Sequence, residues 1–181
     1  NLTISDISLN GLTNPSSWKP YNDFSYKRTC LTIGQTYPLT VHVSAGFSDA
    51  KLMVWVDWNN DFDFDDANEL VLDSATGSNL QYNINVTPPY AAIIGEVRMR
   101  MRYEVVSQGP TNAPCGTSDF GEVEDYTINL EQDGYIYIDS AWSPGDPSGV
   151  STAADNITVI NGATSLTSDT VANNLVIKTV A

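Results

Sequence analysis

Apolar and polar residues alternate along several short stretches of the chain, and a period of two residues is typical of β-strands with one buried face. The alternation is clearest at residues 37–43 and 51–57. Further strand candidates are residues 80–86, 95–105, 123–130 and 135–139. Gly, Pro, Asn and Ser gather between these stretches, and no stretch keeps a helical period over the length of a helix. The pattern predicts an all-β protein built around an antiparallel β-sandwich, of jelly-roll-like or immunoglobulin-like type.

The composition of the chain changes near residues 131–134. Before this point lie both Cys and three of the four Trp, and after it Lys178 is the only basic residue. We expect residues 1–131 to form the sandwich, and residues 132–181 to form a Ser-, Thr- and Asn-rich β extension or the start of a second β-element. Because this extension has few large apolar side chains, we expect it to pair with the sandwich or to donate strands to a neighbouring copy.

The charge balance excludes two classes of partner. The chain has 22 acidic and 8 basic residues, a formal net charge of −14, and this field repels phosphate backbones and anionic lipids. We therefore expect no nucleic-acid binding. The apolar runs are far too short to span a bilayer, so we expect no membrane insertion. An acidic chain that is poor in Lys and rich in Asn, Thr and Ser indicates a secreted or cell-surface β-protein.

Catalysis finds little support in the sequence. His42 is the only histidine, so Ser–His–Asp, Cys–His and multi-histidine zinc sites would all depend on one residue. Paired carboxylates could serve glycoside hydrolysis, but the acidic residues gather in one loop and beside one Arg-rich strand. We expect a protein that is not an enzyme.

The two cysteines are far apart in the sequence. In an oxidising compartment Cys30 and Cys115 are compatible with one long-range disulfide, which we predict. The alternative is a pair of buried free thiols.

The densest chemical signal is an acidic loop at residues 57–69. Oxygen-bearing side chains stand at alternate positions, as in the first half of an EF-hand loop, and Ca²⁺ takes six to eight such oxygens. Two positions depart from that loop: Phe62 stands where Gly is required, and Asn68 stands where a bidentate Glu closes the site. The alternative is a solvated acidic loop, but six carboxylates within thirteen residues repel one another strongly without a cation. We predict a Ca²⁺ site with the ligands Asp57, Asn59, Asp61, Asp63, Asp66 and Glu69.

Three arginines share one face of the strand expected at residues 95–105. Arg98, Arg100 and Arg102 alternate with apolar residues, and Glu122 and Glu124 lie on a following strand that could pair with it. We predict a cross-strand ionic ladder between these arginines and glutamates. The alternative is an exposed arginine row that grips anionic ligands.

Several motifs together resemble the GEVED domain family of secreted and surface proteins of Bacteroidetes. The residues 121–126 read Gly-Glu-Val-Glu-Asp-Tyr, and the stretches at 54–59, 95–100 and 114–116 are similar to the family in the same order. The resemblance covers roughly residues 1–131. It implies an all-β, non-catalytic accessory module, whose partner chains include secreted metallopeptidases, glycan-active enzymes and large adhesins. The extension is similar to β-solenoid-like stretches of proteins exported by type IX secretion.

These observations leave three functions open. The first is a cell-surface module for adhesion or assembly, stabilised by Ca²⁺ and contacting other copies or surface glycans. The second is a carbohydrate-binding accessory module of a secreted hydrolase or peptidase, with Trp18, Trp58 or Trp142 stacking on sugar rings. The third is a structural subunit of an extracellular filament that uses strand donation. A flat row of solvent-facing aromatic side chains would favour sugar binding, whereas buried aromatic side chains would favour adhesion or assembly.

Overall fold

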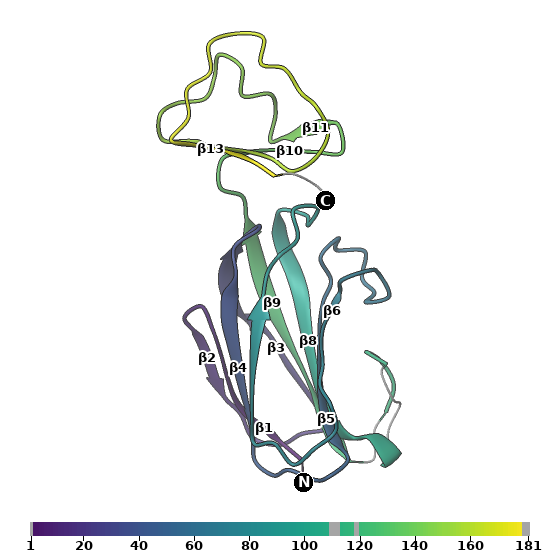
Figure 1. Cartoon of the computed structure of the whole chain (residues 1–181). Coiled ribbons are helices and arrows are strands. Elements are labelled where there is room, and N and C mark those ends of the chain that lie inside the picture. Colours follow the sequence, from purple (N-terminus) through teal and green to yellow (C-terminus); the bar gives the residue numbers. More distant parts are fainter. Residues whose placement is uncertain (1, 109–112, 118–119, 179–181) are drawn as a thin grey trace.

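The computed structural model describes residues 2–108, 113–117 and 120–178. Two β-sheets pack face to face, and a third, smaller sheet lies at the end of this sandwich opposite the N-terminus (Figure 1). The described residues contain a single 3-10 turn, η1 (Val106–Gln108), and otherwise strands and loops. None of their helical segments has the length and apolar character needed to cross a membrane. The all-β sandwich predicted from the alternation is confirmed.

The first sheet of the sandwich has the strand order β2-β1-β4-β7, and all its neighbours are antiparallel. Its strands are β1 (Ile4–Leu9), β2 (Leu12–Pro15), β4 (Tyr37–Val43) and β7 (Gln81–Val86). The second sheet has the order β3-β9-β8-β5-β6, in which β3 and β9 run parallel and the other pairs antiparallel. Its strands are β3 (Tyr21–Thr32), β5 (Ala50–Val56), β6 (Leu70–Asp73), β8 (Gly95–Val105) and β9 (Gly121–Glu131).

The core lies between these two sheets and follows the alternation of the sequence. From the first sheet, Leu39 and Val41 of β4 are fully buried, and from the second sheet Met99 and Met101 of β8 are fully buried. The face of the second sheet that is turned away from the first sheet, called here the outer face, also buries side chains. Trp55 is only 2% exposed on this face, so the outer face is covered at this position of β5.

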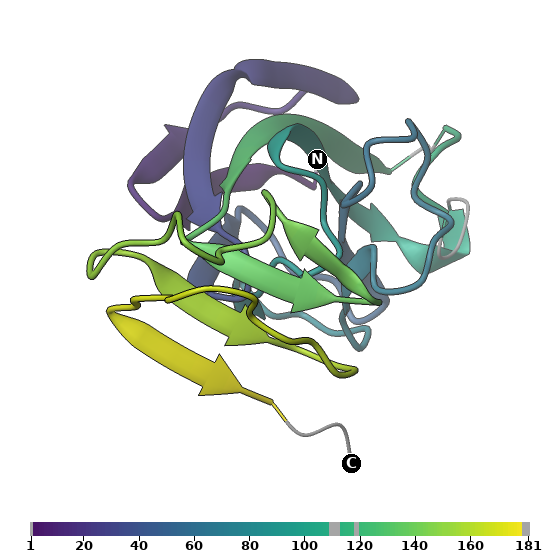
Figure 2. The ribbon, with the colours of Figure 1, turned by 90° about the horizontal axis from the view of Figure 1, so that it is seen from above.

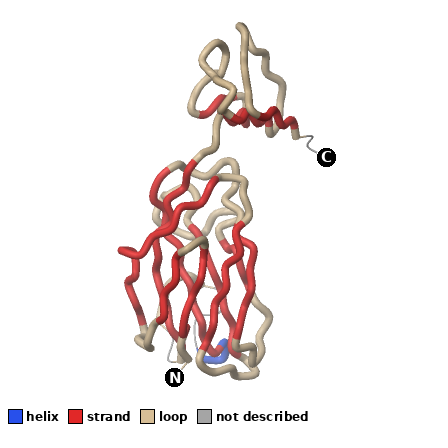
Figure 3. Tube along the Cα trace, turned by 90° about the vertical axis from the view of Figure 1, so that its left-hand side faces the viewer, coloured by secondary structure: helices blue, strands red, loops and turns tan. Residues whose placement is uncertain are grey.

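The third sheet is built entirely from residues of the C-terminal extension. It has the order β11-β10-β12-β13, with β10 (Tyr135–Ile138), β11 (Ala141–Ser143), β12 (Asn156–Val159) and β13 (Asn174–Ile177). β10, β12 and β13 run parallel, and Figure 2 shows them side by side across the end of the sandwich. The connecting loops lie on the side of this sheet that faces away from the sandwich (Figure 3). The strands of the extension pair with one another and not with strands of the sandwich, so the expectation that the extension adds strands to the sandwich is wrong. Strand donation to another copy stays a prediction.

The two parts meet next to the predicted boundary. β9 ends at Glu131 and β10 begins at Tyr135, so the change of composition coincides with the change of sheet. Gly134 makes this connection possible: its φ is +78°, and a Cβ there would collide with the backbone of Asn156. Independent folding of residues 1–131 stays a prediction.

Candidate functional site

The acidic loop connects the edge hairpin β5–β6, and its two ends are fixed by backbone hydrogen bonds. The amide of Val56 donates to the carbonyl of Glu69 at 2.9 Å, and the amide of Asp57 donates to the carbonyl of Arg98 on β8 at 3.0 Å. The loop therefore begins and ends at a rigid sheet while its middle lies outside the ladder.

Inside the loop, the backbone is folded by its own aspartate side chains. The two carboxylate oxygens of Asp57 accept the amides of Asp61 and Phe62, at 3.2 and 3.1 Å. Further along, Asp61 accepts the amide of Asp63, and Asp63 accepts the amide of Asp65, so the turn is repeated every second residue. This repetition explains why oxygen-bearing residues alternate in the sequence.

The loop also needs left-handed backbone at three positions. Asn60, Phe62 and Asn68 have φ values of 55°, 75° and 73°. Asparagine tolerates this region, but a phenylalanine there is strained. Phe62 thus holds the conformation that Gly supplies at the sixth position of an EF-hand loop. The loop thus has Phe where an EF-hand loop has Gly, but its backbone adopts the left-handed conformation that the Gly would adopt.

All five acidic residues predicted as ligands converge. Oxygen atoms of Asp57, Asp61 and Glu69 lie within 4.8 Å of one another, and so do oxygen atoms of Asp61, Asp63 and Asp66. Asp61 belongs to both groups, so together they form one acidic centre, called here the loop centre. Asp57 and Glu69 are 2% and 1% exposed, so two of its carboxylates are buried side by side.

Asn59, the sixth predicted ligand, lies at the same place. Its Nδ2 donates to Asp61 Oδ2 at 2.9 Å and to Asp66 Oδ2 at 2.6 Å. The side-chain amide of Asn59 therefore lies between the carboxylates of Asp61 and Asp66, at a position from which a cation could contact both. A rotation of the amide would turn its oxygen toward the same point.

Glu69 closes the loop from its far end. Its Oε1 accepts the amide of Trp58 at 3.0 Å, and its Oε2 accepts the amide of Asp66 at 3.3 Å. Burial raises the pKa of Glu69, and the charges of Asp57 and Asp61 raise it further. None of the ion pairs among the described residues involves a carboxylate of the loop. In the part of the chain that the structure describes, the negative charge of the loop centre is therefore not balanced by an ion pair with a basic side chain.

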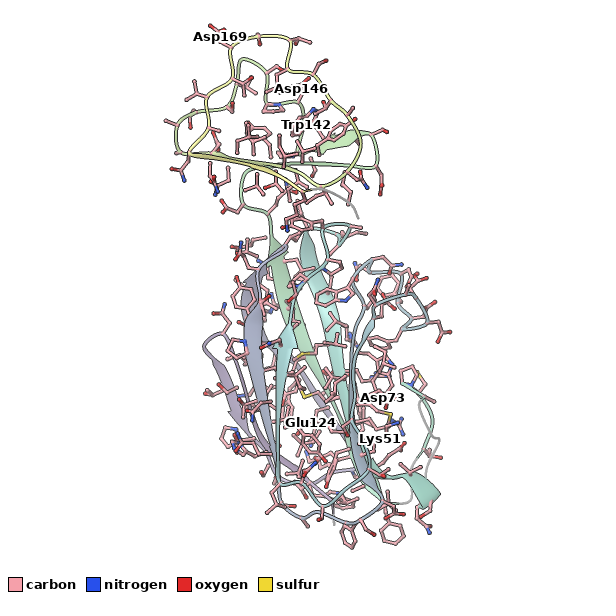
Figure 4. All side chains as sticks on the ribbon, viewed as in Figure 1. Lys51, Asp73, Glu124, Trp142, Asp146 and Asp169 are labelled. Atoms are coloured by element: carbon pink, nitrogen blue, oxygen red, sulfur yellow. The ribbon has the colours of Figure 1, made fainter. Side chains whose placement is uncertain are left out.

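Trp58 has a structural role that the sequence did not reveal. It is 5% exposed, and its Nε1 donates to the carbonyl of Asn68 at 3.0 Å, across the base of the loop. Trp18 is 40% exposed on the sandwich. Trp142 packs on Tyr137 in the third sheet, with ring centroids 5.1 Å apart (Figure 4). The three tryptophans proposed for glycan stacking thus form no common platform.

The ionic ladder predicted between β8 and β9 has a different acidic partner. Arg100 lies opposite Asp125, and it donates from Nε to Oδ1 and from Nη2 to Oδ2, both at 2.7 Å. Arg98 reaches the same carboxylate at 3.2 Å. Asp125 is fully buried beneath these arginines. The hydrogen bond to Asp125 raises the pKa of Arg100.

Arg102 has yet another acidic partner: its Nη1 contacts Glu104 Oε2 at 3.1 Å, and its Nη2 donates to the carbonyl of Gly116 at 2.8 Å. Both side chains of this pair are buried. All three arginines therefore bind acidic groups of their own face, through Asp125 and Glu104, and only the Asp125 pairs cross from β8 to β9.

Glu122 and Glu124 point the other way, into the core between the sheets, so their assignment to the ladder is wrong. They share the parity of Tyr126 and Ile128 on β9, whereas the arginine face carries Asp125 and Val123. Glu122 accepts the amide of Ile4 at 2.7 Å. Burial raises the pKa of Glu122, and this effect is larger than the lowering caused by its hydrogen bonds. Figure 4 shows Glu124 inside the sandwich.

The predicted disulfide is absent, and Cys30 and Cys115 are free and exposed. Asn129 Nδ2 donates to Cys30 Sγ at 3.8 Å, whereas Arg100 Nη1 lies 3.4 Å from Cys115 Sγ. Arg100 pairs with Asp125, four residues before Asn129 on β9. Cys30 therefore lies near Asn129, and Cys115 lies near Asp125. These two positions on β9 are roughly 13 Å apart, whereas a disulfide needs a Cα–Cα separation below about 7 Å.

A pocket of about 510 Å³ lies on the outer face, between the loop and β8. Phe62 and Phe64 line it from the loop, Arg98 and Arg100 from β8, and Pro114 from the following segment. The guanidinium carbon of Arg100 lies over the Phe64 ring, 5.4 Å from the centroid of the ring. The loop centre therefore fixes one wall of this pocket.

No curated protein matches the chain. Residues 51–129, from the start of β5 to near the end of β9, match the family model of the GEVED domain, which supports the resemblance noted at residues 121–126 over this part of the chain.

Proposed function

We propose that the protein is a non-catalytic extracellular module for adhesion or assembly, and that Ca²⁺ bound at the loop centre stabilises it. The observation that carries the proposal is the gathering of five carboxylates in two groups that share Asp61, with the Asn59 amide between two of them. Two of these carboxylates are buried, and none forms an ion pair with a basic side chain among the described residues. A cation relieves the repulsion between such groups.

The donor set favours calcium over other metals. Its side chains offer oxygen ligands alone, and hard cations prefer carboxylate and amide oxygens. Six oxygen-bearing side chains suit the larger coordination number of Ca²⁺, whereas Mg²⁺ needs a stricter octahedral geometry and usually keeps several waters. The left-handed backbone at Phe62 adds the tight turn that EF-hand loops require at this position.

A metal in this loop would order a surface for binding. Phe62 is 88% exposed, and it borders the pocket on the outer face together with Phe64. Fixing the loop lowers the entropy that a ligand must remove on binding, and this raises affinity. A surface that other proteins or glycans contact would therefore depend on Ca²⁺. The composition and the GEVED resemblance support a secreted or cell-surface location. We include in the proposal that the protein is exported by type IX secretion.

Calcium titration of the full chain tests the proposal. With the site loaded at a hundredfold excess over the Kd, a single site adds about 2.7 kcal/mol to the free energy of unfolding. Thermal unfolding should shift upward with CaCl₂ and return with EDTA, and isothermal titration calorimetry should show one site. Asp57→Asn and Asp61→Asn should each remove most of this shift.

Asp169→Asn is the matched control, because Asp169 lies at the far end of the third sheet's loops (Figure 4). It should retain the full calcium response. A melting temperature of the unaltered chain that does not respond to CaCl₂ or EDTA would reject the calcium proposal.

A further inference from the structure

The pocket on the outer face lies beside the loop centre but is built mostly from other residues. Its volume of about 510 Å³ is within the range of sites that bind small ligands. The loop centre contributes Asp57 and Asp63 to its lining, and the other lining residues include Phe62, Phe64 and Arg98. The pocket is therefore a feature of this face that is distinct from the place where the metal is proposed to bind.

Phe62 presents an uncovered ring at this pocket. The side chain is 88% exposed, and the backbone has a φ of 75°, at which a residue with a Cβ is strained. The neighbouring Phe64 is half-buried, and the Arg100 guanidinium already lies over its ring. Neither burial nor backbone conformation favours an aromatic residue at position 62, and strain of this kind is typical of ligand-binding positions. Phe62 thus offers a free aromatic face to a ligand.

Polar groups around the pocket have hydrogen-bonding capacity that the described residues do not use. Arg98 is 49% exposed in its side chain and makes one hydrogen bond, of 3.2 Å, to Asp125. Arg100 holds the same carboxylate through two hydrogen bonds of 2.7 Å, so most donors of Arg98 stay available. In the part of the chain that the structure describes, no hydrogen bond or ion pair involves the Asp65 carboxylate or the Asn60 side-chain amide. Donors and acceptors are therefore both available at the pocket.

The charges of the lining are mixed in sign, and this selects the class of ligand. Asp63, Asp65 and Glu96 line the pocket together with Arg98 and Arg100. The carboxylates repel an anionic ligand, and the guanidinium groups repel a cationic one. A wholly apolar ligand would remove water from charged groups without replacing the lost hydrogen bonds. A neutral sugar fits this lining, because its hydroxyls donate and accept hydrogen bonds and its C–H face packs on an aromatic ring.

We propose that this pocket binds a neutral sugar unit of a surface glycan. The sugar ring would stack on Phe62, and its hydroxyls would accept hydrogen bonds from Arg98 and donate them to Asp65, while Asn60 can do either. The inference rests on the proposed function, because it names the class of glycan that an adhesion module would contact. Calcium at the loop centre would fix the wall that carries Phe62 and would strengthen this binding.

A basic peptide is the strongest alternative occupant, because the chain has a formal net charge of −14. The local contacts favour the sugar. Glu96 is already paired with Arg28, and both oxygens of Asp57 accept backbone amides of the loop. A basic side chain in the pocket would meet the half-exposed guanidinium of Arg98. The carboxylates that would attract such a peptide are thus partly satisfied, whereas the group that would repel it is not.

NMR titration of the full chain in CaCl₂ tests the inference. The probes are neutral tetrasaccharides of glucose, galactose, mannose or N-acetylglucosamine, and a galacturonic acid tetrasaccharide and a tetralysine peptide are the charged comparisons. At least one neutral tetrasaccharide should shift the amide signals of residues 60–65 and the Nε–H signal of Arg98. The charged probes should leave these signals unchanged, and the same titration in EDTA should give weaker sugar binding.

Two variants connect this binding to the pocket. In Arg98→Gln the affinity for the bound tetrasaccharide should fall at least about tenfold, because hydrogen bonds from a charged donor are lost. In Phe62→Ala the affinity should fall about fivefold, because the aromatic face is lost. Lys19→Gln and Phe47→Ala are the matched controls, since both residues are exposed and neither lines the pocket. Both controls should bind as tightly as the unaltered chain.

The inference would be overturned if no neutral tetrasaccharide shifted these signals, or if either charged probe did. Equal affinities in Arg98→Gln, Phe62→Ala and the controls would also overturn it. Arg98→Gln should keep the calcium-dependent shift of the melting temperature, so the two proposals can fail separately. A chain that responds to calcium but binds no sugar rejects the sugar site alone. A chain that binds the sugar but does not respond to calcium rejects the metal alone.

Discussion

The hydroxyl of Tyr126 donates a hydrogen bond of 2.7 Å to Glu124 Oε2, and both side chains lie on the face of β9 that points between the sheets. Asn14 Nδ2 donates to the same hydroxyl at 2.8 Å. Glu124 Oε1 has no hydrogen bond among the described residues, and the nearby Ser16 hydroxyl donates to the carbonyl of Ile4 instead. A fully buried carboxyl with one open oxygen is better accommodated protonated than charged. Burial raises the pKa of Glu124 to about 7.

The first prediction is that stability falls as pH rises toward neutrality. The pKa of Glu124 is about 7 in the folded state and near 4.5 in the unfolded chain, so the folded state binds this proton more tightly. The contribution is complete below about pH 4.5, is lost between there and pH 7, and amounts to about 3 kcal/mol. Urea unfolding in EDTA across this range should show the fall.

Glu124→Gln should remove the Glu124 part of this fall, because the amide has no proton to lose, and should leave the smaller part due to Glu69 and Glu122. Glu131→Gln, at an exposed position of the same strand, should leave it intact. A pH dependence that is the same in Glu124→Gln and in the unaltered chain would contradict the assignment.

The second prediction separates the two arginines that share Asp125. Arg100 is 17% exposed in its side chain and makes two short hydrogen bonds, whereas Arg98 is 49% exposed and makes one longer bond. Arg98→Ala should cost less than about 1 kcal/mol, as exposed ion pairs do. Arg100→Ala leaves the buried Asp125 with Arg98 and with the hydroxyl of Tyr21, which donates to Oδ2 at 2.9 Å, and should cost about 3 kcal/mol because the closest charged partner is lost.

Chemical denaturation of both variants at one pH checks this ordering. Arg100→Lys should recover only part of the loss, because an ammonium group cannot form the two parallel hydrogen bonds. Equal losses for Arg98→Ala and Arg100→Ala would mean that Asp125 is not held mainly by Arg100.

The third prediction is that both thiols are accessible in the folded protein. Cys30 and Cys115 are exposed and lie at different places on the second sheet. Alkylation of the native chain without reductant, followed by intact-mass analysis, should add two labels. Cys30→Ser and Cys115→Ser should each remove one label and leave the other reactive. An unlabelled chain that takes two labels after reduction would contradict this.

The sequence predicted those parts of the structure that depend on local alternation. The strands around 51–57 and 95–105 were recognised because one face of each is apolar, and the gathering of acidic side chains in the loop was recognised because their spacing repeats every two residues. That these side chains bind a metal stays a prediction. The choice of face for Glu122 and Glu124 was missed. The signal was present, since Tyr126, Ile128 and Leu130 share their parity, but the nearby arginine face offered basic partners for these glutamates and favoured the opposite face.

Other features depend on contacts between distant segments. The distance between Cys30 and Cys115 follows from the register of β3, β9 and β8, which no local pattern sets. The parallel pairing of β10, β12 and β13 is likewise invisible in short windows, because its partners are separated by coils of 18 and 22 residues. Each strand there has four residues, too few for the alternation to identify a partner.

The last prediction concerns the strained residue of the acidic loop. Phe62 has a φ of 75° and is 88% exposed, so its ring gains little from burial while its backbone occupies a region that favours glycine. A left-handed conformation costs a residue with a Cβ about 1–2 kcal/mol, and the greater freedom of glycine in the unfolded chain offsets about half of that. Phe62→Gly should therefore raise the free energy of unfolding by up to about 1 kcal/mol. Ala67→Gly is the matched control, since Ala67 is exposed in the same loop and has no positive φ; it should lower stability. Urea unfolding in EDTA measures both variants without any contribution from a metal. A loss of stability in Phe62→Gly comparable with that in Ala67→Gly would show that the ring of Phe62 makes contacts that outweigh the strain of its backbone.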